Sequence, residues 1–174
     1  MLLSPIPQRS FGGFMSDTYI TDEIRHALNV ERDVMVSPPI AESDIRKWAI
    51  AVYWPETPPK QFWDAEYAKT TRWGGIIAPE EFNPFAWPIE RREATRLGGP
   101  QGKDLGQRGM NGGSEAWYYN PMRPGDVIRS ATKLVEAYEK TGRIGRMMFL
   151  VNETTWTNQH GELIKVDRKT SIRY

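Results

Sequence analysis

Cysteine is absent from the sequence of 174 residues, and histidine occurs only at His26 and His160. The absence of cysteine excludes disulfide bonds, thiolate zinc sites, iron–sulfur clusters and thiol nucleophiles. The two histidines show none of the close spacings of a metal site, so we interpret them as solvated polar residues and expect neither a metal nor a cofactor. A chain without cysteine also suits the cytoplasm, which is the compartment we expect.

Excess charge of one sign and long apolar runs are missing as well. The 23 basic and 22 acidic residues leave a net charge of +1, whereas dedicated nucleic-acid-binding domains carry a basic excess. The longest apolar run has seven residues, 48–54, and a membrane-spanning helix needs about 18. We therefore expect neither nucleic acid nor a membrane as a partner.

The first residues lack the apolar stretch of an export signal because Pro5 and Pro7 interrupt it. We expect residues 1–18 to be a disordered extension. A single domain then follows over residues 19–174, a length that can bury a sizeable core.

Aromatic residues are abundant by contrast, with seven tryptophans, seven tyrosines and six phenylalanines. Most of these rings should pack in the core, and the remainder suits an apolar ligand tunnel or a subunit interface. The apolar candidates for substrate contact are Phe62, Trp63, Ile77, Phe82 and Phe85.

The first half of the chain predicts short helices around one strand. Each expected helix begins at a capping residue or ends at proline or glycine. The expected elements are a helix over 21–29 capped by Thr21 or Asp22, a strand over 31–37, a helix from Ser43 to Pro55, and a helix after Asp64 that ends at Gly74. The second of these helices carries an apolar stripe of Ile45, Trp48, Ala49 and Val52.

The second half predicts strands. A glycine-rich segment over 91–113 shows no periodicity and is interpreted as a long loop. Strands are expected from Ser114 onward, over 127–139, 146–157 and 162–173, with turns between them. Helices followed by an antiparallel meander define an α+β class.

Three charged side chains are candidates for chemistry. Glu56 and Asp64 flank the proline-rich loop after the second helix, and paired acids can act as general acid and base. Their ordinary interpretations are a solvated loop residue and a helix N-cap. Arg143 lies in an expected turn, where it either meets a ligand phosphate or is simply solvated.

Three stretches resemble one known family, the MaoC-like dehydratases, and in particular their N-terminal, FAS1-like dehydratase domain. They are IRKWAIAVYWPETPPKQFWDAEYAKTTRWGGIIAPEEF, MNGGSEAWYYNPMRPGDVI and the ending from Tyr138. The resemblance implies a hot-dog fold, in which an antiparallel sheet wraps around a central helix, here from Ile76 or Pro79 onward. It also implies the hydration of trans-2-enoyl thioesters, or the reverse dehydration, on coenzyme A or acyl carrier protein.

The sequence departs from that family at its catalytic positions. Phe62 stands where the family has its catalytic histidine, and Glu56 stands where it has its aspartate. Ala78 and Pro79 replace the His-Gly pair that begins the central helix, and proline has no N–H to donate to the thioester carbonyl.

We therefore expect the non-catalytic half of an enoyl-thioester hydratase, which pairs with a hot-dog subunit that carries the aspartate and histidine. Homodimer formation is also open, because a lone hot-dog sheet leaves an edge exposed. One alternative is a self-sufficient homodimeric hydratase or thioesterase that uses Glu56 or Asp64. The other is an acyl-CoA-binding module without catalysis.

Overall fold

The computed structural model describes residues 18–89 and 108–174. In chain order the elements are α1 (Asp22–His26), β1 (Glu31–Val36), α2 (Glu42–Tyr53), the 3₁₀ helix η1 (Lys60–Phe62), α3 (Ala65–Thr70), β2 (Gly109–Tyr118), β3 (Arg129–Gly142), β4 (Gly145–Thr157) and β5 (Leu163–Arg173). The predicted α+β class is confirmed. None of the described helices is long and apolar enough to cross a membrane.

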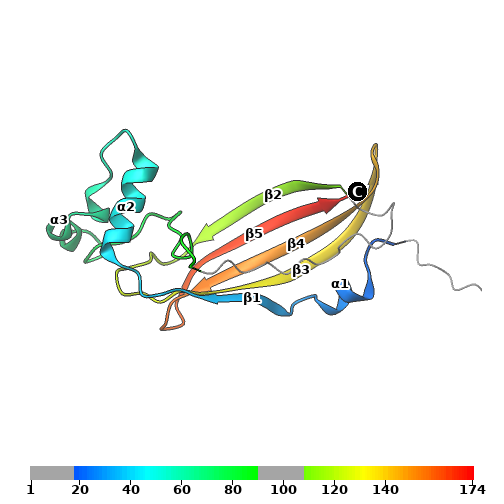
Figure 1. Cartoon of the computed structure of the whole chain (residues 1–174), viewed down its shortest axis with the longest axis horizontal. Coiled ribbons are helices and arrows are strands. Elements are labelled where there is room, and N and C mark those ends of the chain that lie inside the picture. The colour runs from blue at the N-terminus through cyan, green and yellow to red at the C-terminus, as the bar shows by residue number, and fades with distance from the viewer. Residues whose placement is uncertain (1–17, 90–107) are drawn as a thin grey trace, which may run out of the picture.

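The five strands form one antiparallel sheet in the order β1-β3-β4-β5-β2. The predicted meander of β3, β4 and β5 is confirmed, with short turns between long strands. In Figure 1 helices α2 and α3 gather at one end of the long sheet, and the turn between β3 and β4 lies at the other. The sheet thus has a helical end and a hairpin end.

Strand β2 begins at Gly109, five residues earlier than the expected first strand at Ser114. Residues 109–113 were expected to end a loop, but all of them except Gly112, which lies at a register shift, pair with β5 and extend the ladder as far as Arg173. A Cβ atom at Gly112 would lie 2.8 Å from Thr170 Cγ2. Glycine is therefore required here for a close approach between strands, although its propensity alone predicts a loop. Residues 90–107 of the expected loop lie outside the described part of the chain.

The central helix expected from Ile76 or Pro79 is wrong for the described residues 76–89, which run as an extended stretch followed by turns. Three prolines in this stretch, Pro79, Pro84 and Pro88, each lack the N–H that a helical turn needs. Single turns form instead, as where the Phe82 N–H donates to the Pro79 carbonyl over 2.9 Å.

The main core lies at the helical end, where the predicted apolar face of α2 packs through the fully buried Ile45 and Ala49. Trp48 of the same face meets Phe82 edge-on, with ring centroids 5.6 Å apart. Val52 is the exception in the predicted stripe, because half of it is exposed.

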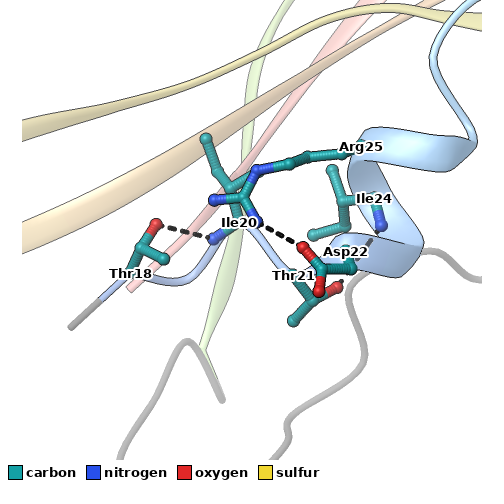
Figure 2. A network of polar contacts seen from close by, with 6 residues as sticks. All are labelled: Thr18, Ile20, Thr21, Asp22, Ile24 and Arg25. Carbon is teal, nitrogen blue, oxygen red and sulfur yellow. Dashed lines mark hydrogen bonds and ion pairs between the residues drawn. The ribbon is translucent and has the colours of Figure 1, made fainter. Parts of the chain in front are cut away.

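A second, smaller core holds α1 against the sheet. Ile24 of α1 is fully buried in a cluster with Leu134, Met148 and Leu150. Figure 2 shows how the helix begins: the Thr21 hydroxyl accepts a hydrogen bond from the Ile24 N–H over 3.3 Å. The prediction of Thr21 as the cap is confirmed. The expected extension, apart from residue 18, lies outside the described residues.

Candidate functional site

A pocket of about 550 Å³ opens at the helical end of the sheet. Its walls come from the end of α2, from η1, from the extended stretch before Phe82, and from the end of β2 with the loop that follows. The apolar lining consists of Val52, Tyr53, Phe62, Trp73, Ile77, Ala78, Pro79, Tyr119, Pro121, Met122 and Ile164. The polar lining consists of Gln61, Arg72, Glu80, Glu81, Tyr118 and Asn120.

Backbone hydrogen bonds fix the wall between Trp73 and Pro79. The Ala78 N–H donates to the Met122 carbonyl over 2.8 Å. The Arg123 guanidinium donates to the Trp73 carbonyl over 2.8 Å. The Arg123 N–H in turn donates to the Asp126 carboxylate over 2.7 Å, within the turn predicted from the sequence RPGD. The turn after β2 therefore braces the opposite wall of the pocket.

A carboxylate and a phenol meet at the polar side of the pocket. The Tyr118 hydroxyl donates a hydrogen bond to Glu81 Oε1 over 2.6 Å. Burial of the ring, and then the Glu81 carboxylate, raise the pKa of the Tyr118 hydroxyl well above its ordinary value. Tyr118 therefore stays protonated at neutral pH and orients the Glu81 carboxylate within the pocket.

Two of the predicted substrate-contacting residues, Phe62 and Ile77, do line the pocket, and both are about 95 % buried. Phe62 packs beside Tyr53 with ring centroids 5.9 Å apart. Whether the two residues contact a substrate stays a prediction.

The two carboxylates considered as candidates for chemistry are not in the described pocket lining. Glu56 is exposed in the loop after α2. Asp64 accepts a hydrogen bond from the Tyr67 N–H over 3.0 Å and so caps α3, as the ordinary interpretation expected. Trp63 donates its indole N–H to the Pro58 carbonyl and is also absent from the described lining.

The remaining candidates lie elsewhere. Phe82 is buried against Trp48, and Phe85 meets Trp156 with ring centroids 5.2 Å apart. Arg143 lies in the turn between β3 and β4. Since β3 has 14 residues, at about 3.3 Å each, that turn lies roughly 40 Å from the pocket end of the strand. The structure thus does not place Arg143 at this pocket.

Glu81 and Tyr118 were missed as site residues. In the sequence, Glu80 and Glu81 indicated only the first turn of a helix, and Tyr118 only an aromatic strand. The two side chains are 37 residues apart, and no motif spacing joins them. The only local signal was a pair of acids directly after a proline, which is equally typical of a helix start.

Among the described residues, the pocket lining contains neither a histidine nor a free backbone N–H at the expected thioester position. Neither His26 nor His160 lines the pocket. At the expected thioester position, the Ala78 N–H is already donated to Met122 and Pro79 has none. The pocket can bind an apolar group and present a carboxylate, but these two positions offer no N–H to polarise a carbonyl.

Solved structures with the same arrangement identify the fold. A MaoC-like dehydratase from Rhodospirillum rubrum is 18% identical, with 86% of this chain and 94% of that chain covered at a TM-score of 0.56. The ChsH1–ChsH2 complex from Mycobacterium tuberculosis is 14% identical, with 83% and 84% covered at a TM-score of 0.62. The HadBC (3R-hydroxyacyl-ACP dehydratase) complex from the same organism is 16% identical, with 83% and 99% covered at a TM-score of 0.51.

At these identities the likeness shows the fold alone, and it confirms the predicted hot-dog architecture. The family follows from the sequence. The family model described as "FAS1-like, dehydratase domain region" matches residues 31–166. The chain belongs to this family of dehydratase domains, as the three stretches quoted above predicted. No curated protein sequence is significantly similar to the chain.

Proposed function

We propose that this chain is the non-catalytic subunit of an enoyl-thioester hydratase, which in the reverse direction is an (R)-3-hydroxyacyl-thioester dehydratase. Its role is to supply a wall of the acyl-binding site and a surface for its partner. The partner is a second hot-dog subunit that carries the aspartate and histidine.

The observation that carries this proposal is Phe62. By the resemblance of the sequence, Phe62 takes the position of the family's histidine, and its side chain is buried in the pocket wall. A phenyl ring cannot accept a proton from water, so this pocket has no general base at that point. The occupied Ala78 N–H and the missing N–H of Pro79 support the same conclusion. Family membership supplies the reaction class.

The heteromeric assembly rests on a further comparison. Two of the similar structures are described as complexes, ChsH1–ChsH2 and HadBC, and the latter is named as a hydroxyacyl-ACP dehydratase. The proposed substrate is accordingly an acyl thioester of coenzyme A or acyl carrier protein. The apolar walls of the pocket suit the acyl group.

The test is hydration of a short and a bulky trans-2-enoyl-CoA, followed at the thioester-conjugated double bond. The purified chain alone should give no turnover, and mixing with a hot-dog subunit that has the aspartate and histidine should give turnover above that of the partner alone. A partner variant without its histidine is the matched control. Turnover by this chain alone that persists through repurification would overturn the proposal.

A second function, self-sufficient catalysis by a carboxylate, is favoured by one specific observation. Glu81 lines the pocket and is oriented by Tyr118, whereas the two acids first considered do not line it. In this function Glu81 takes a proton from water as the oxygen adds to C3 of the enoyl group, and returns a proton to C2. Glu81→Gln would then abolish turnover by the isolated chain, while Glu56→Gln would leave it intact.

A further inference from the structure

A row of polar side chains crosses four strands of the sheet beside the pocket. Tyr118 of β2 lies opposite Lys165 of β5, Lys165 opposite Trp156 of β4, and Trp156 opposite Ser130 of β3. Directly opposed residues of an antiparallel sheet point to the same face and stand about 5 Å apart. The row therefore presents a phenol, an ammonium, an indole and a hydroxyl side by side on one face.

The last three members of this row are buried. Lys165 is 6% exposed, Trp156 is 7% exposed and Ser130 is 1% exposed. Lysine is rarely buried to this extent unless its charge is paired. Here Lys165 Nζ lies 3.3 Å from Asp167 Oδ2 and 4.1 Å from the centre of the Trp156 ring. The ion pair and the aromatic face together account for the charge of Lys165.

Two polar groups of the row, on Trp156 and Ser130, have no hydrogen-bond partner among the described residues. Lys165 Nζ faces Asp167, the Trp156 ring and, 6.0 Å away, the centre of the Tyr118 ring. The indole N–H of Trp156 and the hydroxyl of Ser130 are buried without any hydrogen-bond partner. Buried polar groups in folded proteins almost always have partners. Two buried polar groups on adjacent strands without a partner, next to a buried ammonium, therefore indicate a missing acceptor.

The row begins at the pocket wall. Tyr118 is the member of the row that lines the pocket. The hydroxyl of Tyr118 is already donated to Glu81. Lys165, Trp156 and Ser130 are not in the described pocket lining themselves, so an acceptor that enters from the pocket has to pass Tyr118 to reach them.

We propose that Lys165, Trp156 and Ser130 form a subsite for a hydrogen-bond-accepting oxygen, a carbonyl or a carboxylate, on the acyl group of the substrate. This inference rests on the proposed function, because it names a substrate class for the same pocket. The proposed enzyme therefore acts on acyl groups that carry oxygen away from the thioester, in preference to plain alkyl chains. A structural water that bridges Trp156 and Ser130 is the competing explanation.

The experiment compares three saturated thioesters of equal chain length, so that binding is measured without turnover. Pentanoyl-CoA ends in a methyl group, 4-oxopentanoyl-CoA carries a ketone, and glutaryl-CoA ends in a carboxylate. Calorimetric titration of the full chain should show binding of an oxygenated thioester about tenfold tighter than that of pentanoyl-CoA, since a hydrogen bond to a charged donor supplies that much. A preference for glutaryl-CoA alone assigns a carboxylate, and an equal preference for both assigns a carbonyl oxygen.

Variants assign the preference to this row. Lys165→Met keeps most of the buried stem and should remove the preference, and Ser130→Ala, which barely changes the packing, should reduce it. Lys169→Met is the matched control, because Lys169 lies on the same face of β5 but is exposed; it should keep the preference. The indole N–H resonance of Trp156, assigned through Trp156→Phe, should move downfield with the preferred thioester and stay in place with pentanoyl-CoA.

The possible results separate the proposed subsite from the proposed function. Equal binding of all three thioesters, or a preference that survives in both Lys165→Met and Ser130→Ala, overturns the subsite and leaves the proposed function standing. An unmoved Trp156 resonance under tight binding favours the structural water and also overturns the subsite. Failure of every thioester to bind, both to this chain alone and to its mixture with the partner subunit, overturns the proposed function, and the subsite with it.

Discussion

The pair of Tyr118 and Glu81 is the strongest electrostatic feature of the pocket at the scale of single residues. Burial of the ring and the neighbouring carboxylate both disfavour the ionised phenolate. Each cause can be removed separately by mutation. The pair thus allows a test of the site's geometry that needs no substrate.

The first prediction concerns the ionisation of Tyr118. The difference between the spectrophotometric titrations of the wild-type chain and Tyr118→Phe isolates one phenol, and its midpoint should lie above the ordinary value near 10. In Glu81→Gln the midpoint should fall, because the carboxylate charge is gone, yet remain raised by burial. Glu56→Gln is the control and should leave the midpoint unchanged. If the titration midpoint of Tyr118 is the same in Glu81→Gln as in the wild-type chain, the hydrogen bond between Tyr118 and Glu81 is contradicted.

The sequence identified single residues where their role is local. Asp64 as a cap, and a cap at Thr21 or Asp22 that the structure places at Thr21, follow from neighbours within a few positions. The contact between Glu81 and Tyr118 could not be predicted in this way. It exists only because the stretch after Pro79 and the end of β2 converge on the same pocket, which is a property of the tertiary fold.

Helix α3 shows at the scale of elements how much one cap contributes to a short helix. With six residues, α3 is too short to be stable alone. Asp64→Ala should lower the free energy of unfolding by about 1 kcal/mol, since it leaves the Tyr67 N–H without its acceptor. Asp64→Asn keeps an acceptor oxygen and should cost little. Urea unfolding of both variants measures the difference, and equal losses would show that the negative charge, and not the hydrogen bond, matters.

The edge strand β1 is tied to β3 by ion pairs. Glu31 Oε2 lies 2.7 Å from the Arg129 guanidinium, and Lys133 is 3.7 Å from the other oxygen. The hydrogen bond from Arg129, with the charges of both cations, lowers the pKa of Glu31 below its ordinary value near 4.5. The unfolded chain thus binds the proton more readily than the folded one at this group.

A pH dependence follows from that direction. A lowered pKa contributes stability above the ordinary pKa, and the contribution is lost as pH falls through the lower folded value. The wild-type chain should therefore unfold less readily than Glu31→Gln at neutral pH, and the difference should shrink below about pH 4.5. Chemical unfolding of both proteins across the acidic range provides the measurement. If the difference in stability between the wild-type chain and Glu31→Gln stays constant with pH, it arises from packing and not from the charge of Glu31.

The elements that sequence analysis predicted wrongly lie where the local pattern does not decide the structure. Local propensity favoured a loop before Ser114, but pairing with β5 extends β2 back to Gly109. The acids after Pro79 favoured a helix start, but further prolines at 84 and 88 leave turns through residue 89. In both places the outcome depends on long-range pairing, or on whether several weak local signals combine, and a pattern within one window does not show either.

Strand β2 bears on assembly at the scale of the whole molecule. Among the described strands it forms one edge of the sheet and pairs with β5 alone, and it is exposed along nearly its whole length. Its sequence, GMNGGSEAWY, contains no proline or lysine, two of the residues that natural edge strands use to prevent pairing, and its protective features are Glu115 and the register shift at Gly112. We therefore expect the partner subunit, or a second copy of the chain, to add a strand at this edge.

Proline substitutions at two adjacent positions test this expectation. Successive residues of an antiparallel strand direct their N–H groups alternately toward one neighbour and the other. Of Ser114→Pro and Glu115→Pro, one should therefore break a hydrogen bond to β5 and destabilise the fold, while the other removes only the outward N–H. The second variant should unfold near the wild-type temperature yet lose assembly in sedimentation. If the variant that keeps its fold assembles as the wild-type chain does, the contact with the partner lies elsewhere, because an added strand cannot tolerate the loss of the N–H that it would pair with.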